Sequence, residues 1–440
     1  MKKKALLLSV LMAALCLFSA CDRNVENKGA LISPPALFEG QNEIMKALKA
    51  SVGENISLEY PKTGENRSAF VLSDLNGDTQ PEVIAFYRPV SEEITQDVAH
   101  INILDEVDGA WVSVCDIVGE AKGIDRVSIG NFGGKKEIIV GWELMRDREK
   151  VLVCYSVSNK TPKRDFSATY VEFALSDFWS ENEGDELITL NYSQTTENLT
   201  EPTQHARLIT YGDNGFSIKS STPLDSRVTG YKSCIAGKVS ETQTAFFLDG
   251  LIDAATVNSQ ILLVNKKGQL ENPLLNGDKT DDENIHKPTM LTQDMDGDGI
   301  FEVPHQKAVT GYENVPESEK IYKTVFKRLE DGRLQKSHVV YINTALGIRI
   351  TIPEKLDTRV TIKPLAAQNE IVFYEYEGSL SESTKEIFSV RVSDKKTYQK
   401  TQGYDVLKST DFTVVTVKIT DDESEFCPTW KTLYSIVEIM

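Results

Sequence analysis

The chain has 440 residues, of which 26% are charged, and a formal net charge of −18 at pH 7. This acidic balance argues against nucleic acid as a partner, because the phosphate backbone requires a basic face. Hydrophobic residues make up 40% of the chain, which is enough for globular cores, and the length predicts two or three domains.

The first 21 residues have the layout of an export signal. Lys2–Lys4 precede an apolar run over residues 5–18, which is broken only by Ser9. Because a bilayer-spanning helix needs about 20 apolar residues, the run predicts a secretory signal. It ends in Leu17-Phe18-Ser19-Ala20-Cys21, which resembles the signal of bacterial lipoproteins. The resemblance implies a signal peptide over residues 1–20 and a lipid (palmitate among its acyl chains) on Cys21. The alternatives are an ordinary cleaved signal and an uncleaved anchor.

A lipid on Cys21 would place the protein on the extracytoplasmic face of the cell membrane, since two or more acyl chains hold a protein stably on a bilayer. Loss of residues 1–20 removes three lysines and changes the net charge from −18 to −21. Residues 21–40 predict a short linker. Asn42–Val52 has helical apolar spacing and predicts one amphipathic helix that packs on the domain that follows.

Two acidic segments far apart in the chain share one pattern. Residues 74–82 and 294–302 each have aspartate or asparagine at positions 1, 3 and 5 and glutamate at position 9, just before a β-type run. Weaker copies occur at Glu137, Glu186 and Thr244. Corresponding positions are 55, 49, 58 and 58 residues apart. The spacing indicates an internal repeat.

A second element recurs between these copies: a β-type run, a two-residue turn and another β-type run. Such turns require positive φ, which glycine, aspartate and asparagine tolerate, so they predict hairpins. The turn pairs are Asp108-Gly109, Asn214-Gly215, Lys267-Gly268 and Asp331-Gly332. Four antiparallel strands in each repeat of roughly 40–60 residues are typical of a propeller blade. We therefore expect a mainly β chain, with a β-propeller of five to seven blades over residues 41–342.

In these segments the chain resembles the FG-GAP/VCBS-like repeat family, the calcium-loop propellers that include integrin α-chain heads and many bacterial surface proteins. The resemblance is carried by residues 74–86 and 294–303 and is weak in the three middle copies. It implies the propeller fold and calcium in the two strong loops. It does not indicate which ligand the protein binds.

The oxygen atoms of the two acidic loops point to calcium on chemical grounds as well. Calcium takes six to eight hard oxygen ligands, and alternate residues of a tight loop can supply them. The first set is Asp74, Asn76, Asp78 and Glu82 with the Gln80 carbonyl; the second and fuller set is Asp294, Asp296, Asp298 and Glu302 with the Ile300 carbonyl. Because the loop fills its own ligand positions, the expected role of the ion is structural. The alternative is a solvated acidic turn without metal.

The repeat ends at about residue 343, and residues 343–440 predict a separate small α+β domain. Gly347 with Ile352-Pro353-Glu354, followed by Phe388–Val392, resembles a C-terminal module of clostridial-type surface lipoproteins. The resemblance implies no activity. The predicted strands cover residues 346–353, 360–362, 370–376, 387–392 and 412–419.

The sequence contains no recognisable catalytic pattern. The five histidines fall in different units, and there is neither a Gly-x-Ser-x-Gly elbow nor a phosphate-binding glycine loop. The cysteines are widely scattered with no Cys-x-x-Cys pair, which argues against a zinc site. Free thiols are the preferred interpretation, with a disulfide as the alternative, for Cys115, Cys154, Cys234 and Cys427.

These observations predict a lipid-anchored, calcium-stabilised binding or sensing module at the cell surface, without catalytic residues. Its expected contacts are the membrane, through the lipid, and an unidentified protein or glycan ligand. A glycan-active hydrolase or lyase on a propeller scaffold is the first alternative. A structural or assembly factor of an envelope complex, marked by a large exposed apolar patch, is the second.

Overall fold

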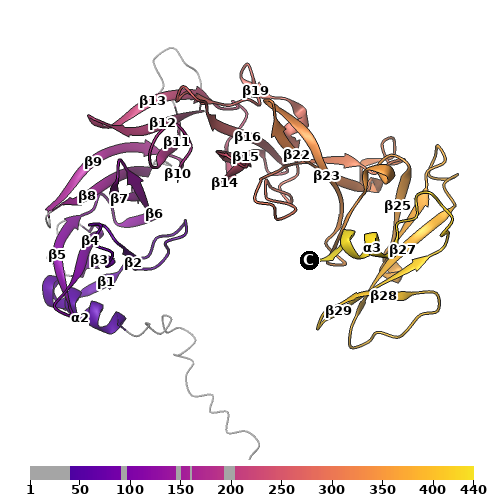
Figure 1. Cartoon of the computed structure of the whole chain (residues 1–440), viewed down its shortest axis with the longest axis horizontal. Helices are drawn as coiled ribbons and strands as arrows, with labels where there is room; N and C mark the ends of the chain where they lie inside the picture. The colour runs from indigo at the N-terminus through magenta and orange to yellow at the C-terminus, as the bar shows by residue number, and fades with distance from the viewer. Residues whose placement is uncertain (1–39, 91–96, 145–149, 159–160, 193–203) are drawn as a thin grey trace, which may run out of the picture.

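The computed structural model describes residues 40–90, 97–144, 150–158, 161–192 and 204–440. Over these residues the chain is mainly β and forms seven antiparallel sheets, six of four or five strands and one of two. The larger sheets follow one another in chain order along an open arc (Figure 1). The predicted signal peptide, Cys21 and all but the last residue of the predicted linker lie outside the described residues.

The first sheet carries the predicted N-terminal helix. Ile44 and Leu48 of this helix are buried against Val83, Tyr87 and other side chains of the sheet, so the helix covers one face of it. The elements are α2 (Gln41–Val52), β1 (Ile56–Leu58), β2 (Phe70–Ser73), β3 (Glu82–Pro89), β4 (His100–Val107) and β5 (Ala110–Val118). The prediction of an amphipathic helix is confirmed.

The second, third and fourth sheets are built from consecutive antiparallel strands. The second sheet contains β6 (Gly123–Phe132), β7 (Lys135–Glu143), β8 (Lys150–Ser158) and β9 (Thr161–Tyr170). The third contains β10 (Glu172–Ser176), β11 (Glu186–Tyr192), β12 (Gln204–Gly212) and β13 (Gly215–Pro223). The fourth contains β14 (Gly230–Ser240), β15 (Gln243–Asp253), β16 (Thr256–Val264), β17 (Leu270–Glu271) and β20 (Ile285–His286).

A short excursion follows β17, and the fifth sheet then begins. The excursion contains β18 (Leu275–Asn276), β19 (Lys279–Thr280) and the 3₁₀ turn η1 (Asp282–Asn284). The fifth sheet contains β21 (Val303–Ala308), β22 (Tyr322–Glu330), β23 (Arg333–Asn343), β24 (Ile348–Thr351) and β30 (Val437–Ile439), with the turn η2 (Glu317–Glu319) between β21 and β22.

The last sheet packs directly on the fifth. Its elements are β25 (Val360–Leu365), β26 (Glu370–Glu375), β27 (Glu386–Asp394), β28 (Asp405–Ser409) and β29 (Thr413–Ile419), with η3 (Glu354–Leu356), η4 (Ala366–Gln368) and helix α3 (Trp430–Ile436). One hydrophobic core joins Val339 and Ile350 of the fifth sheet to Ile371 and Val415 of the last. The final strand, β30, returns to pair with β24. The domain boundary between residues 342 and 343 stays a prediction.

Consecutive sheets pack face to face, and each interface has its own core. Ile84 and Val140 share the core of the first and second sheets, and Phe247 and Val303 share the core of the fourth and fifth. Helix α2 covers one end of the row, and the last sheet covers the other. The mainly β prediction is confirmed, and the sheets are stacked like blades. The arc is open in Figure 1, with the first and last sheets at opposite ends.

The repeat seen in the sequence recurs in the strand register. Glu82 and Glu186 open β3 and β11, Glu137 lies at the start of β7, and Glu302 directly precedes β21. The hairpin turn pairs join the strands that they were expected to join. Asp108 and Asp331 have φ of 53° and 49°, followed by glycines at 77° and 75°, as a two-residue turn of this type requires.

Candidate functional site

The first acidic loop is held by its own side chains. The Asp74 carboxylate accepts hydrogen bonds from Gly77 N (2.6 Å) and Thr79 N (3.0 Å). Asp78 Oδ1 accepts from Gln80 N at 2.8 Å, and the buried Glu82 accepts from Leu75 N at 2.7 Å. Asn76 Oδ1 accepts from Asp78 N at 2.8 Å, and the Asn76 amide donates to Glu82. These bonds close the loop on itself, with the Asn76 amide nitrogen rather than its oxygen facing Asp78 and Glu82.

The last acidic loop repeats these bonds. Asp294 accepts from Gly297 N (2.8 Å) and Gly299 N (2.9 Å), and Asp298 accepts from Ile300 N (2.8 Å). The fully buried Glu302 accepts from Met295 N at 2.8 Å. Carboxylate oxygens of Asp294, Asp296 and Asp298 lie within 4.8 Å of one another and could hold a metal ion.

The two loops differ in the residue that faces the glutamate from the next strand. Val83 follows the glutamate of the first loop and pairs with Leu104, and Val303 follows the glutamate of the last loop and pairs with Lys327. Because both strand pairs are antiparallel, the residue after each partner lies opposite the loop glutamate. In the first loop this residue is Asp105. In the last loop it is Arg328. One position therefore carries opposite charges in the two copies.

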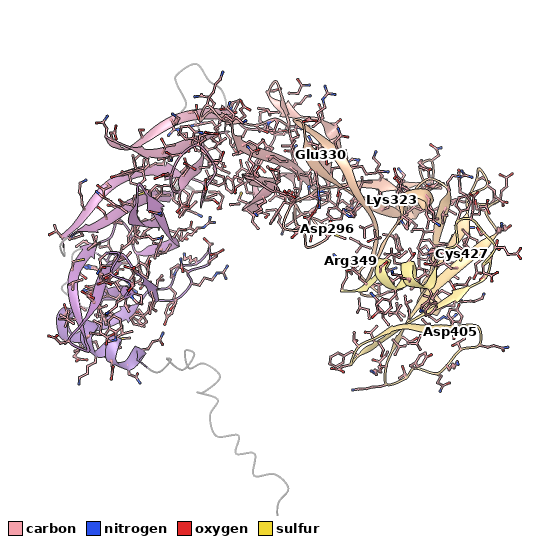
Figure 2. The ribbon with its side chains drawn as sticks, in the orientation of Figure 1. Asp296, Lys323, Glu330, Arg349, Asp405 and Cys427 are labelled. Atoms are coloured by element: carbon pink, nitrogen blue, oxygen red, sulfur yellow. The ribbon has the colours of Figure 1, made fainter. Side chains whose placement is uncertain are left out.

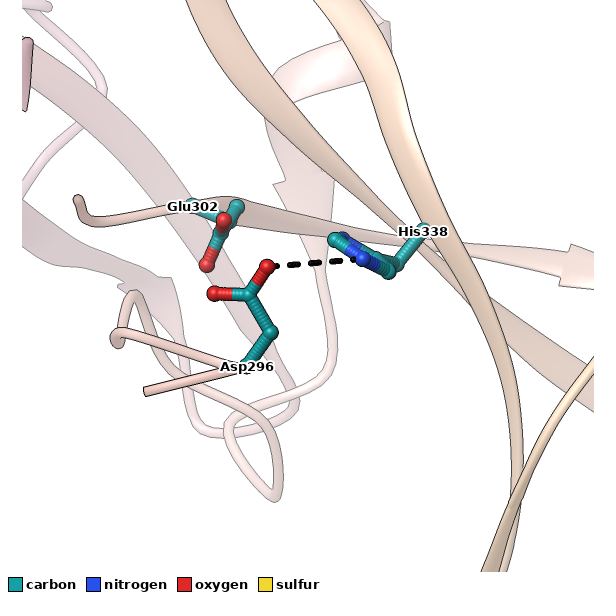
Figure 3. Close-up of side chains that lie close together, drawn as sticks. All are labelled: Asp296, Glu302 and His338. Atoms are coloured by element: carbon teal, nitrogen blue, oxygen red, sulfur yellow. Dashed lines mark ion pairs between the residues drawn. The ribbon is translucent and has the colours of Figure 1, made fainter. Parts of the chain in front are cut away.

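Arg328 already supplies a cation to the last loop. Its guanidinium donates to Glu302 at 2.6 Å and to Asp296 at 3.1 Å, and it lies 2.8 Å from Asp298. On the other side of Asp296, His338 Nε2 is 3.5 Å from the carboxylate (Figure 3). Burial raises the pKa of Glu302, and the contact with Arg328 opposes that increase. A metal ion on the Asp296–Glu302 side of this loop would have to displace the guanidinium.

The first loop has no such counter-charge among its described neighbours. Asn76, Glu82 and Asp105 line a cavity of about 240 Å³, whose other walls are Leu75, Ile103, Val114 and Val157. Burial raises the pKa of Glu82, and the nearby Asp105 and Asp78 carboxylates raise it further. Asn76, Glu82 and Asp105 offer oxygen atoms to a hard divalent cation here without a competing cation among the described residues, but of the two loops only the last brings three carboxylates within 4.8 Å of one another.

The glutamate carboxylates of the middle copies have other hydrogen-bond partners than those of the two acidic loops. Glu186 accepts from Phe178 N (2.9 Å), Trp179 N (3.0 Å) and the Asn182 amide (2.7 Å). Glu137 is 1% exposed, and its Oε2 has no hydrogen-bond partner. Burial raises the pKa of Glu137 to about 7. Among the described residues, neither the Glu137 copy nor the Glu186 copy brings together an oxygen set for a metal ion.

A cavity of about 810 Å³ lies along β2, β6, β10 and β14, which are called the inner strands below. Residues 64–67, Lys136 of β7 and Asp185 complete its lining. Each of these four strands is the end strand of its sheet. Arg126 of the second sheet forms hydrogen bonds with the third sheet. Its guanidinium donates to Phe173 O (2.7 Å) and to the Glu172 carboxylate (2.9 Å). The cavity thus crosses four consecutive sheets.

A buried serine–histidine–aspartate group lies elsewhere, in the fourth sheet. Ser259 Oγ is 2.6 Å from Asp249 Oδ1 and 2.8 Å from His286 Nε2, while His286 Nδ1 faces the Lys287 carbonyl at 3.1 Å. All three side chains are at least 96% buried. Thr292 N and Oγ1 also donate to Asp249 at 2.8 Å. The group connects the segment after β17 to the fourth sheet.

The sequence located both acidic loops but missed Arg328, Asp105 and the cavity. Nothing in the local pattern identifies Arg328, which lies 26 residues after Glu302 and meets it only through strand pairing. Arg328 could have been found only by aligning β21 with β22 in the correct strand register. Cys115, Cys154, Cys234 and Cys427 are free thiols, and only Cys154 is fully buried.

No protein-family model and no curated protein matches the chain. The solved structures similar to it are β-propeller proteins. Rhamnogalacturonan lyase YesW is 9% identical with a TM-score of 0.30, over 73% of this chain and 76% of that one. A putative 6-phosphogluconolactonase from Bacteroides fragilis is 10% identical with a TM-score of 0.26, over 71% and 95%. Sqt1 from Chaetomium thermophilum is 13% identical with a TM-score of 0.30, over 83% and 98%. TM-scores this low do not show a shared fold or activity.

Proposed function

We propose that this chain is a membrane-anchored extracytoplasmic lipoprotein that binds a ligand in the inner-strand cavity. The cavity of about 810 Å³ is the observation that carries the proposal, because it is built from four sheets and exposes charged and apolar side chains together. Sites that bind ligands are typically concave, with apolar walls and a few polar groups that fix orientation.

The anchor rests on the sequence around Cys21, which lies outside the described residues. Within the described part, no helix is long and apolar enough to cross a bilayer. Helix α2 begins 20 residues after Cys21, so a lipid there would hold the first sheet close to the membrane. We also propose that the blade-like sheets are repeats of the FG-GAP/VCBS-like kind.

Calcium in the first loop is the structural element of the proposal. Asp74, Asn76, Asp78, Glu82 and the Gln80 carbonyl would hold the ion, with Asp105 facing the site from β4. Bound calcium would neutralise these carboxylates and fix the loop that joins β2 and β3 of the first sheet. In the last loop, Arg328 provides that neutralisation on the Asp296–Glu302 side from within the chain.

Ligand binding in the cavity can be tested on intact cells. A photo-crosslinking amino acid at Leu72, which is exposed and lines the cavity, should give a cross-linked product. The matched control is Val112 on β5, which is equally exposed but lies outside the cavity. Equal products from both positions, or none from position 72, would contradict binding in this cavity.

The anchor has its own test. Cys21→Ala should abolish incorporation of an alkyne-tagged fatty acid and release the protein from the membrane fraction. Cys115→Ala is the control, since this cysteine lies within β5. If the alanine variant at position 21 still incorporates the label, the lipid is not on Cys21.

A further inference from the structure

We propose that the end of the chain makes a second contact with the membrane, through three exposed aromatic rings that lie in the interfacial region of the bilayer. These rings, Phe412, Trp430 and Tyr434, form the C-terminal patch. The inference rests on the proposed function, because a lipid on Cys21 is what would keep the bilayer within reach of this patch.

Exposed aromatic side chains are concentrated near the end of the chain. Among the described residues, the exposed large aromatic side chains are Tyr60 and the three rings of the C-terminal patch. Phe412 is 75% exposed, the highest value among the exposed large hydrophobic side chains. Large apolar groups that gather on one part of a surface typically mark an interaction site, whereas single ones need no explanation.

The three rings border one groove. Tyr434 and Thr410 line a groove of about 420 Å³ whose other walls come from β28 and β30. Trp430 lies one helical turn before Tyr434 on α3, so the two rings share a side of the helix. Phe412 lies in the turn after β28, where its N–H donates to Thr410 Oγ1 at 3.3 Å. β28 and β30 are end strands of their sheets, so no further described strand covers the groove.

The packing of α3 does not require these rings. Leu433 and Ile436 are the buried residues of the helix, and both belong to the core shared by the fifth and last sheets. Trp430 and Tyr434 are 42% and 56% exposed. The helix therefore contributes its aliphatic side to the core and presents its aromatic side to the surroundings.

The lysines beside the rings favour a bilayer over a second protein surface. Lys408 Nζ lies 4.7 Å from the centroid of the Tyr434 ring. Lys395, which is exposed, donates its backbone N–H to Phe412 O at 2.8 Å. At a bilayer interface, aromatic rings lie at the headgroup level, and lysine stems cover apolar surface while the ammonium stays in water. Protein–protein interfaces are instead depleted of lysine.

The charge around the patch does not oppose contact with an anionic bilayer. Residues 394–412 and 430–440 together contain five lysines and four acidic residues, whereas the whole chain has 48 basic and 66 acidic residues. Anionic lipids repel an acidic surface and attract nearby lysines. Charge therefore favours this part of the molecule over the average of its surface.

The position of the predicted tether permits both contacts at once. Helix α2 begins 20 residues after Cys21, and an extended chain of that length spans at most about 70 Å. Figure 1 shows α2 and the β28–β29 hairpin at the two ends of the arc, both on its lower side. One bilayer on that side would lie within reach of the lipid and of the C-terminal patch.

The test measures vesicle binding by residues 22–440 without lipid, a chain that keeps every described contact because these all lie after residue 39. The probe is a vesicle of phosphatidylcholine with a minor share of phosphatidylglycerol, and binding is measured by cosedimentation. We expect Phe412→Ser/Trp430→Ser/Tyr434→Ser to weaken binding about tenfold or more. The control Tyr60→Ser/Val112→Ser/Val118→Ser removes three exposed apolar side chains elsewhere and should bind like wild type. Unchanged unfolding temperatures show that each variant is folded.

Three results would overturn the inference. Equal weakening in the two triple variants, or none in either, places any membrane contact outside the C-terminal patch. Absence of vesicle binding by the folded wild-type chain contradicts the contact itself. A dimer that forms without vesicles and is lost in the patch variant, with no vesicle binding, makes the occupant a second copy of the chain. None of these results affects lipid labelling at Cys21 or cross-linking from position 72, which test the proposed function separately.

Discussion

The first and last acidic loops are alike in backbone and opposite in charge balance. In both, position 1 accepts from the amides of positions 4 and 6, position 5 accepts from position 7, and the glutamate accepts from position 2. The facing strand then contributes Asp105 to one loop and Arg328 to the other. Local sequence therefore sets the shape of the turn, and a distant residue decides whether the turn needs an external cation.

The largest expected effect comes from removing the internal cation. Arg328→Gln leaves the fully buried Glu302 without its charged partner, and loss of one member of a buried ion pair typically costs about 3 kcal/mol. In the presence of a chelator, we expect urea unfolding of this variant to show that loss of unfolding free energy. Added calcium should restore part of it. Arg349→Gln, which breaks a half-exposed pair with Glu438, is the control and should cost far less. Figure 2 marks Arg349 and Asp296. Equal losses in the two variants would contradict the role given to Arg328.

Transplanting the cation should remove the difference between the loops. Asp105→Arg places a guanidinium opposite Glu82, so the first loop should no longer respond to calcium. Wild-type protein should gain about 2.7 kcal/mol at a hundredfold excess of calcium over its dissociation constant, and the variant should gain none. Glu106→Arg changes an exposed neighbour in the same way and should keep the response. A variant at position 105 that responds like wild type would separate the calcium effect from this loop.

The copy at Glu137 extends the comparison, because its glutamate accepts no loop amide and forms no ion pair with a described residue, although Lys163 and Lys135 lower its pKa from a distance. Its pKa is raised to about 7, so the folded state holds this proton more tightly than the unfolded state does. The stability it contributes is complete below about pH 4.5 and falls as pH rises to about 7, by at most about 1.4 kcal/mol per pH unit. Glu137→Gln should remove that slope in unfolding curves measured between pH 4.5 and 8. Glu106→Gln should leave it in place, and a slope that survives Glu137→Gln belongs to another group.

Local features of this fold could be predicted, and non-local ones could not. The Asp-Gly turns at 108 and 331 need positive φ, and the loops at 74 and 294 are stabilised by bonds within nine residues, so both are visible in the sequence. The pairing of β30 with β24 joins residues 89 apart, including Arg349 and Glu438. Lys323 likewise connects the fifth sheet to Asp357 at 2.7 Å. Such contacts depend on which sheet faces meet, and no local spacing records them. The open arc follows from the same contacts, since α2 and the last sheet cover the two ends of the row.

The most direct test of the difference between the loops is a calorimetric calcium titration of three proteins: wild type, Asp74→Asn/Asp78→Asn and Asp296→Asn/Asp298→Asn. The account predicts one high-affinity ion per chain in wild type, lost in the first variant and retained in the second. An ion that persists in the first variant and disappears in the second would contradict it, because calcium would then prefer the loop that already holds a guanidinium.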